Sequence, residues 1–198
     1  SSFDVNAFFS NGRSLGFATR GKINLDSKKG TLLDLKAYFQ DFALSPFNPF
    51  VEGIFYDLRG KMSGLVNIKG SITDPLMDGE LTLHKAGVGI TYLKLNTDIQ
   101  EGARIKVNNK TFDIDNWLLT DTAYKTQAKL NGSIRHNKLL DWFLDLRLQT
   151  LGKRFMVLNT PYTDDALFYG TAFIKGNASI KGALDEIAIK VNAKTEEG

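Results

Sequence analysis

The sequence feature that most constrains this fold is an alternation of apolar and polar residues that recurs along most of the chain. Because successive side chains of a β-strand point to opposite faces, each alternating run predicts a strand with one apolar face and one polar face. The apolar positions of the clearest runs are Leu81 and Leu83; Tyr124, Ala128 and Leu130; Trp142, Leu144, Leu146 and Leu148; and Ile187, Ile189 and Val191.

Turn-forming residues separate these runs. The chain has 18 glycines and 4 prolines among 198 residues, and 42% of its residues are apolar. The spacing predicts an all-β, antiparallel meander of about a dozen strands rather than a βαβ protein. The apolar face of such a sheet must be covered, so a β-sandwich, a closed barrel and a curled, open trough all remain compatible with the pattern.

A short phrase, Ile-Lys-Gly, occurs three times, at residues 68–70, 174–176 and 180–182. Residues 64–83 and 176–195 share a layout of strand, Lys-Gly, short acidic turn and second strand, and Gly-Ser-Ile at 132–134 precedes a further strand pair. Each unit predicts a β-hairpin in which the glycine that follows the first strand supplies the positive φ of the turn. The repeat therefore indicates a sheet that is extended by adding hairpins.

One segment departs from the alternation. Its apolar residues recur at helical spacing, which predicts a short helix over residues 45–58 with its aromatic stripe packed on the sheet. A membrane-surface helix is disfavoured, because the polar face carries Glu52 and Asp57 and little positive charge. The stripe consists of Phe47, Phe50, Val51, Ile54, Phe55 and Leu58.

The organisation predicted from these patterns is a single domain over residues 1–198. Residues 1–30 form lead-in strands, 45–58 the short helix, and 60–198 the hairpin-extended sheet. The sequence starts without Met and contains no run of about 18 apolar residues. We expect it to be a segment of a longer protein.

The residues that commonly carry chemistry are scarce. There are no cysteines, and neither of the two histidines, His84 and His136, has a second ligand at metal spacing, so no metal site and no cofactor is predicted. His136 is expected in a turn. Asp113 and Asp115 are expected to be solvated charges on a strand. No catalytic motif occurs, and we predict no enzyme.

Nucleic-acid binding is also disfavoured. The formal net charge is only +3, from 25 basic and 22 acidic residues, and residues 152–158 offer a single Lys-Arg pair beside an aromatic residue. A carbohydrate-binding β-domain would need exposed aromatic residues beside carboxylates in a groove, and the sequence does not place such a groove.

An ordered set of glycines and apolar residues carries a resemblance to a known family. Residues 49–96 hold this set, and residues 130–150 and 157–182 continue the likeness. The set is Gly60, Gly64, Val66, Ile68, Gly70, Ile72, Pro75, Gly79, Leu81 and Leu83. From about residue 30 onward the chain resembles the C-terminal domain of the TamB family, and it is most similar to the Bacteroidota-type members. Residues 182–189 lack the proline that follows the upstream repeat.

The resemblance implies a function. TamB proteins are AsmA-like periplasmic β-structures that are anchored in the inner membrane and reach the outer membrane. Their sheet curls into an open trough, a β-taco, with an apolar inside, and they are associated with phospholipid transport and outer-membrane biogenesis. The expected partners are phospholipid acyl chains and a BamA/TamA-like outer-membrane barrel protein with POTRA domains, and the membrane anchor lies outside these residues.

Two hypotheses about the functional residues follow. In the first, the twelve apolar residues of the alternating runs named above line a lipid groove. In the second, the chain is a protein-docking module whose last strand accepts a partner strand by β-augmentation. The candidates for that contact are Ile189, Val191 and Ala193.

Overall fold

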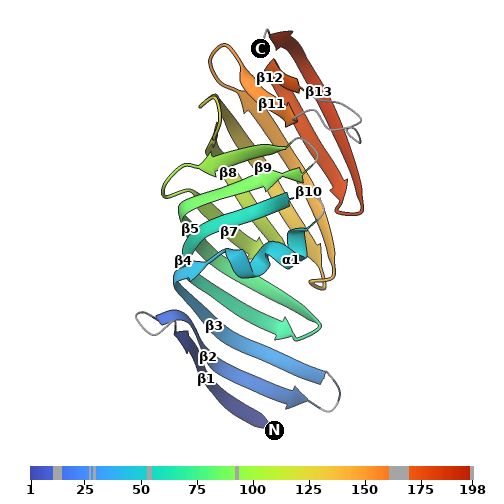
Figure 1. Cartoon of the computed structure of the whole chain (residues 1–198). Helices are drawn as coiled ribbons and strands as arrows, with labels where there is room; N and C mark the ends of the chain where they lie inside the picture. Colours follow the sequence, from blue (N-terminus) through green and yellow to red (C-terminus); the bar gives the residue numbers. More distant parts are fainter. Residues whose placement is uncertain are drawn as a thin grey trace.

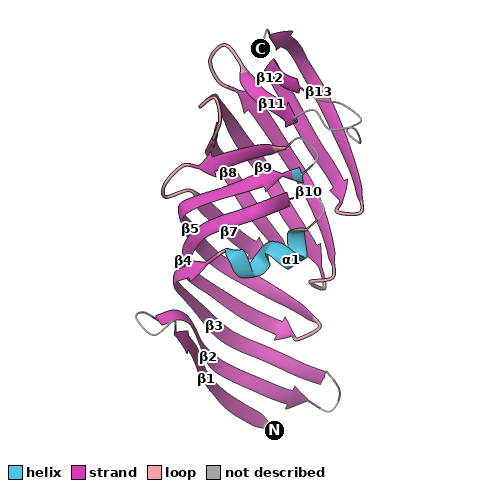
Figure 2. Ribbon diagram, in the orientation of Figure 1, coloured by secondary structure: helices cyan, strands magenta, loops and turns pink. Residues whose placement is uncertain are grey.

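The computed structural model of the protein describes residues 1–10, 15–26, 28, 30–52, 55–91, 94–160 and 170–196. These residues form one antiparallel sheet of 13 strands. The sheet is elongated and curls around its long axis, with the N-terminus at one end and the C-terminus at the other (Figure 1). Almost everything in it is strand, with one short helical segment lying across the sheet (Figure 2). None of the helices in the described residues is long and apolar enough to cross a membrane.

The strands vary from 5 to 17 residues in length. In chain order they are β1 (Ser2–Ser10), β2 (Leu15–Asp26), β3 (Gly30–Ala43), β4 (Phe55–Ser71), β5 (Asp74–Ile90), β6 (Leu95–Ile99), β7 (Arg104–Asn109), β8 (Thr111–Asp121), β9 (Gln127–Asn137), β10 (Asp141–Thr150), β11 (Phe155–Thr160), β12 (Gly170–Ala183) and β13 (Glu186–Glu196).

The strand order is that of a meander. It runs β1-β2-β3-β4-β5-β6-β8-β9-β10-β12-β11, with β7 between β5 and β8 and with β13 on the other side of β12. The sheet is open, because β1 and β13 form its two ends and pair only with β2 and β12 among the described residues. The all-β antiparallel meander that the alternation predicts is confirmed, and so is the open sheet that the family resemblance implies.

The recurring Ile-Lys-Gly phrase does mark hairpins. Ser71 pairs with Asp74 at the β4–β5 turn, and Ala183 pairs with Glu186 at the β12–β13 turn. The predicted place of the glycines is wrong, however, because Gly176 and Gly182 lie inside β12 rather than in turns. A Cβ at Gly182, whose φ is 137°, would lie 2.2 Å from the carbonyl oxygen of Glu186. Glycine here permits close approach of two strands on the concave face.

β-Bulges shape the curl of the sheet. The pairing shifts between Phe39 and Phe42 on β3 and between Ile114 and Trp117 on β8, and in each bulge an Asp or Asn has a positive φ of 51°. A bulge inserts an extra residue, so apolar residues three positions apart come to lie on the same face. The strands therefore bend without losing the continuity of their apolar face.

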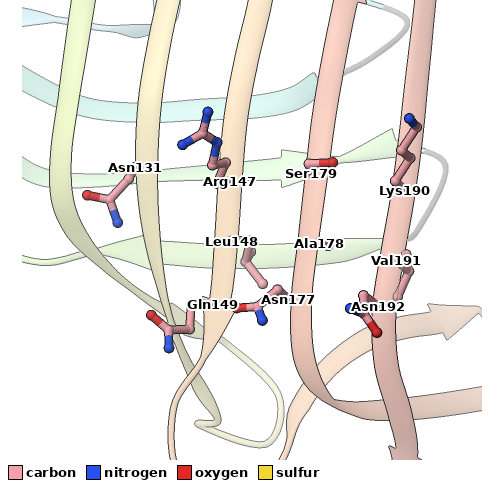
Figure 3. Close-up of a pocket in the computed structure, with 10 residues that line it drawn as sticks. All are labelled: Asn131, Arg147, Leu148, Gln149, Asn177, Ala178, Ser179, Lys190, Val191 and Asn192. Carbon is pink, nitrogen blue, oxygen red and sulfur yellow. The ribbon is translucent and has the colours of Figure 1, made fainter.

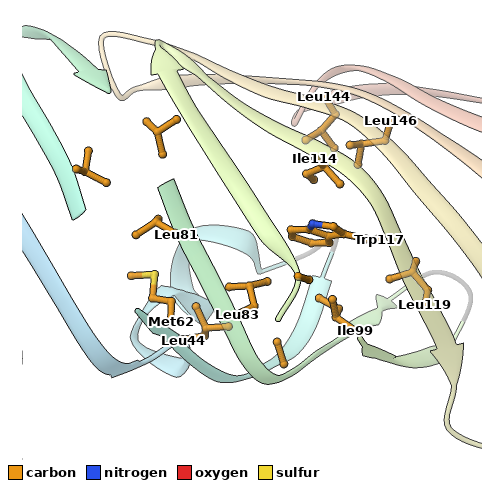
Figure 4. Packing of buried hydrophobic residues seen from close by; sticks show 14 residues of the cluster. Leu44, Met62, Leu81, Leu83, Ile99, Ile114, Trp117, Leu119, Leu144 and Leu146 are labelled. Atoms are coloured by element: carbon orange, nitrogen blue, oxygen red, sulfur yellow. The ribbon is translucent and has the colours of Figure 1, made fainter. Parts of the chain in front are cut away.

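The middle of the concave face is filled by a central core. Its residues come from opposite walls of the curled sheet, so that Leu81 and Leu83 of β5 face Leu144 and Leu146 of β10 across Trp117 (Figure 4). The buried residues of this central core are Leu44, Met62, Val66, Leu81, Leu83, Ala86, Ile99, Ala103, Val107, Ile114, Trp117, Leu119, Leu144 and Leu146.

A smaller core lies towards the C-terminal end. It consists of Leu95, Ala128, Phe155, Met156 and Phe173, and it forms where β11 contacts β6. The two cores explain how one sheet can stay folded without a second layer: its own walls cover each other in the middle.

The helical segment is shorter than the sequence predicts. A 3₁₀ turn covers Ser45–Phe47, and α1 covers only Asn48–Val51. Phe55 and Leu58 already belong to β4, and Ile54 lies outside the described residues. Asp57, with a φ of 49°, adjoins a break in the β4–β5 pairing after Tyr56, so Phe55 and Leu58 both pack against the central core with helix-like spacing.

Candidate functional site

The concave face stays open near the N-terminal end of the sheet, where it forms an aromatic cavity. The cavity has a volume of about 600 Å³. Five of its ten lining residues are phenylalanines, and Asp41 and Lys61 are the charged residues that line it. We call it the aromatic cavity and define it by Phe9, Phe17, Phe39, Phe42 and Phe47.

Strand register brings these rings together. Phe9 pairs with Phe17, and Phe17 pairs with Phe39, so β1, β2 and β3 each place one ring in the same row. The next residue across is Gly64 on β4, which pairs in turn with Leu81 of the central core. The row therefore leads from the aromatic cavity towards the central core.

The bulge in β3 adds a fourth ring. It contains Gln40 and Asp41, and the backbone N–H of Asp41 donates to Ser63 Oγ at 3.0 Å. Phe42 thereby comes to lie 5.8 Å from Phe39 and 6.2 Å from Phe17, measured between ring centroids.

The 3₁₀ turn supplies the fifth ring, because Phe47 lies 6.2 Å from Phe42. Phe9 is 63% exposed and Phe47 is 38% exposed, so these two rings remain in contact with solvent. The aromatic cavity is thus an apolar surface that the described residues leave partly exposed.

The residues predicted to line a lipid groove fall into three groups. Leu81, Leu83, Leu144 and Leu146 are buried in the central core, and Ala128 is buried in the C-terminal one. Leu130, Leu148 and Ile187 are half-buried and pack against the central core, and Trp142 is half-buried beside Phe112 and His136. Tyr124, Ile189 and Val191 are exposed.

This distribution changes how the concave face is understood. In its middle, four of the predicted lining residues lie in one core, with Trp117 between those of β5 and those of β10 (Figure 4). At the two ends, the apolar face remains accessible, at the aromatic cavity in β1–β3 and at the exposed Ile189 and Val191 of β13.

Tyr124 does not lie on a strand, contrary to the predicted run from 124 to 130. The carboxylate of Asp121 accepts hydrogen bonds from the backbone N–H groups of Ala123, Tyr124 and Thr126, which holds residues 122–126 in a turn. The strand starts at Gln127. The Tyr124 ring packs edge-on against Phe173, with 5.1 Å between the ring centroids.

The last strand has a free edge among the described residues, because β13 pairs only with β12. Ile189 is 56% exposed and Val191 is 59% exposed, while Ala193 is half-buried. All three lie on the concave face, in register with Ile180, Ala178 and Gly176 of β12.

The two histidines make different contacts. His84 Nδ1 lies 2.8 Å from Glu101 Oε1, and the pKa of Glu101 is lowered by the backbone N–H of Lys85 and by His84. His136 is buried on β9, not in a turn as predicted. Over the described part of the chain, no cluster of three or more His, Asp or Glu side chains is suited to a metal ion.

Of the five phenylalanines of the aromatic cavity, sequence reasoning singled out only Phe47, as part of the predicted helical stripe. Alternation was present in both strands, at Phe17, Thr19, Ile23 and Leu25 and at Leu33, Leu35, Ala37 and Phe39. What the alternation could not reveal was the bulge that turns Phe42 to the same face as Phe39.

Comparison with known proteins supports one family. Residues 115–198 match the model of the TamB C-terminal domain. The match starts in β8 and continues through β13, so it covers the C-terminal part of the sheet but not the aromatic cavity. Searches of curated proteins and of solved structures each found no match.

Proposed function

We propose that this chain is part of a TamB-like module of the periplasm, in which the apolar concave face of the sheet shields phospholipid acyl chains during transport between the inner and outer membranes. The observation that carries the proposal is the aromatic cavity, an apolar surface that the described residues leave open to solvent at one end of the apolar concave face. The family match supports it, because it suggests a periplasmic, membrane-associated protein.

The physical advantage of such a face is large. Exposing acyl chains to water costs about 0.8 kcal/mol per CH₂, or on the order of 20 kcal/mol for a phospholipid with roughly 30 such groups. An apolar wall removes most of this cost without any catalytic group. The volume of the aromatic cavity, about 600 Å³, lies within the usual range for ligand pockets.

The central core restricts how a lipid could move. Leu81, Leu83, Leu144 and Leu146 are each at most 6% exposed where the two walls meet in the middle of the sheet. The proposal therefore assigns shielding to the open ends, and movement along the whole face requires the two walls to separate.

Photocrosslinking tests the proposal with a matched control. Phe39 and Tyr38 are consecutive aromatic residues of β3, and they point to opposite faces, Phe39 into the aromatic cavity and Tyr38 to the outside. Each is replaced by photoreactive benzoyl-phenylalanine, and the protein is irradiated in cells or with vesicles of phosphatidylethanolamine and phosphatidylglycerol. We expect phospholipid adducts, identified by mass spectrometry, at position 39 and not at position 38. Adducts of equal yield at both positions, or at neither, would contradict the proposal.

A second candidate function is docking of a BamA/TamA-like barrel protein with POTRA domains by strand addition. The free edge of β13, with exposed Ile189 and Val191, favours it. Successive residues of a strand direct their N–H groups to opposite edges. One of the two variants Val191→Pro and Asn192→Pro therefore removes a hydrogen-bond donor from the free edge, and the other disrupts the pairing of β13 with β12. We expect the variant that keeps the wild-type stability to lose the partner in a pull-down. Retention of the partner by that variant would exclude docking at this edge.

The proposal includes no catalysis, no cofactor and no nucleic-acid partner, and it places the membrane anchor outside these residues. The closer resemblance to Bacteroidota-type members remains a prediction.

A further inference from the structure

The outer face of the sheet carries a hollow that is lined by seven polar residues together with Leu148, Ala178 and Val191, and the lipid-shielding proposal does not use its polar residues. It spans β9, β10, β12 and β13 and has a volume of about 510 Å³ (Figure 3). Its polar residues alternate along β10 with Leu144, Leu146 and Leu148, so they lie on the opposite side of the sheet from the central core. We call it the outer hollow, and its main polar residues are Asn131, Arg147, Gln149, Asn177, Lys190 and Asn192.

Register explains why these side chains meet. Arg147 pairs with Asn131 on one side and with Ser179 on the other, and Ser179 pairs with Lys190. In the next row, Gln149 pairs with Asn177, which in turn pairs with Asn192. Two adjacent rows of hydrogen-bonding side chains therefore cross neighbouring strands.

Most of these groups have no partner within the described residues. Arg147, Lys190, Gln149, Asn177 and Asn192 make no ion pair or side-chain hydrogen bond there, and all five are exposed. The neighbouring row on the same face differs, because Lys181 Nζ donates to Asp145 Oδ2 at 3.0 Å. Charges are thus compensated beside the outer hollow but not within it, and no carboxylate lines it.

The strands at the border of the outer hollow also tolerate an unfavourable pairing. Lys175 and Lys194 lie directly opposite each other on β12 and β13, and both are exposed. Like charges in this position destabilise a sheet. Together with Arg147, Lys190 and the nearby Lys129, they make this part of the outer face positively charged.

We propose that the outer hollow binds an anionic saccharide, that is, a sugar carrying a phosphate or carboxylate group. Arg147 and Lys190 supply the positive charge, and since two strand spacings separate their strands, their backbones lie about 10 Å apart. Asn and Gln side chains both donate and accept hydrogen bonds, which matches the hydroxyl groups of a sugar ring. Such a ligand exists free in solution or as the headgroup of a glycolipid, and the chemistry recognised is the same.

The test uses the 198-residue chain labelled with ¹⁵N and titrated with glucose 6-phosphate, glucose and inorganic phosphate, followed by NMR. We expect glucose 6-phosphate to shift amide resonances of β10, β12 and β13 around the outer hollow, and to bind at least tenfold more tightly than glucose or phosphate alone. The double variant Arg147→Gln/Lys190→Gln is expected to lose at least tenfold in affinity while its circular dichroism spectrum stays unchanged.

The control variant is Arg20→Gln/Lys36→Gln, which removes the same charge from an exposed cross-strand pair on the outer face of β2 and β3. It is expected to bind like the wild type. Shifts that spread over other surfaces, persist in the outer-hollow variant, or are reproduced equally by inorganic phosphate would overturn the proposal.

A last arm separates the two sources of the ligand. Co-sedimentation is measured with phosphatidylcholine vesicles that do or do not contain a phosphorylated glycolipid. Binding that requires the glycolipid and is lost in the outer-hollow variant assigns the site to a lipid headgroup, whereas binding of glucose 6-phosphate alone assigns it to a soluble saccharide. Neither outcome depends on the concave face, so a failure here would leave the proposed lipid shielding untouched.

Discussion

The indole Nε1–H of Trp117 donates a hydrogen bond to the backbone carbonyl of Arg104, with 2.7 Å between the heavy atoms. The bond joins β8 to the start of β7 at the place where β8 changes partner, since Ile114 pairs with β7 and Leu119 pairs with β6. The bulge before Trp117 turns its side chain into the central core. One residue thus fills the core and also bridges the gap between two strands.

Removing this side chain should weaken the whole sheet. We expect Trp117→Ala to lower the free energy of unfolding by about 3–5 kcal/mol, because it leaves a cavity in the central core and removes the bond to Arg104. Leu140→Ala, at a position that is 79% exposed, should change it by less than about 0.5 kcal/mol. Urea denaturation followed by circular dichroism measures both values. A loss below about 1.5 kcal/mol for Trp117→Ala would contradict the inference that this side chain stabilises the core between the two walls.

The second prediction concerns a glycine on the concave face that lies very close to the backbone of the neighbouring strand. Gly132 has a φ of 138°, and a Cβ there would lie 2.0 Å from the carbonyl oxygen of Asp145 on β10. Gly152 has a φ of 69° but open space around it. Gly152→Ala should therefore lose only about 1–2 kcal/mol, the cost of the left-handed backbone. We expect Gly132→Ala to lose at least about 2 kcal/mol more, because the strands must also move apart. Equal losses in thermal or urea denaturation would show that steric contact is unimportant.

The difference between the closed middle and the open ends can be tested with a charge. Leu146 is buried in the central core, whereas Ile189 on the same face is exposed. We expect Leu146→Asp to lower the free energy of unfolding by more than about 4 kcal/mol, because it buries a carboxylate without a partner. Ile189→Asp should cost less than about 1 kcal/mol. If Leu146→Asp proved as mild as Ile189→Asp, the walls would have to be open in solution.

The sequence predicts the strands well and the bends poorly, and the bulges are the reason. In Phe-Gln-Asp-Phe at 39–42, Phe-Tyr-Asp-Leu at 55–58 and Ile-Asp-Asn-Trp at 114–117, apolar residues stand three apart with an Asp or Asn of positive φ before the second one. This spacing resembles that of a helix, and at 55–58 it led to the prediction of a helix where β4 begins. An Asp or Asn in this position within an otherwise alternating run is the signal that would have indicated a bulge.

Which parts of the apolar face are covered could not be predicted either. Leu146 and Ile189 have the same place in the alternation, and only the curl of the sheet decides that one meets the opposite wall and the other meets solvent. The contacts of Gly87 and Gly89 could not be predicted from the sequence either. The structure places the Arg59 guanidinium against Gly87 and the Tyr56 ring against Gly89, where a Cβ would lie 2.3 Å from either side chain.

The rim of the sheet near the β9–β10 turn contains a buried histidine with few partners. His136 Nδ1 accepts a hydrogen bond from the backbone N–H of Leu139 at 3.3 Å, so the proton of the neutral ring is assigned to Nε2, which has no partner among the described residues. Lys110 Nζ lies 2.7 Å from the carboxylate of the nearby Asp74. Burial and the charge of Lys110 lower the pKa of His136, and Asp74 opposes them.

This arrangement predicts that acidification weakens the fold before any carboxylate is protonated. Below about pH 6.5 His136 is protonated in the unfolded chain but stays neutral in the folded chain. The free energy of unfolding should therefore fall between pH 7 and pH 5, by up to about 1.4 kcal/mol per pH unit. The lowered pKa values of Asp74, due to its hydrogen bond from Lys110, and of Glu101 act mainly below about pH 5. Urea denaturation at pH 7, 6 and 5 measures how the free energy of unfolding changes with pH. His136→Gln should make this dependence weaker, whereas the control His84→Gln, outside this cluster, should leave it unchanged. A slope that survives in His136→Gln would assign the effect to another group.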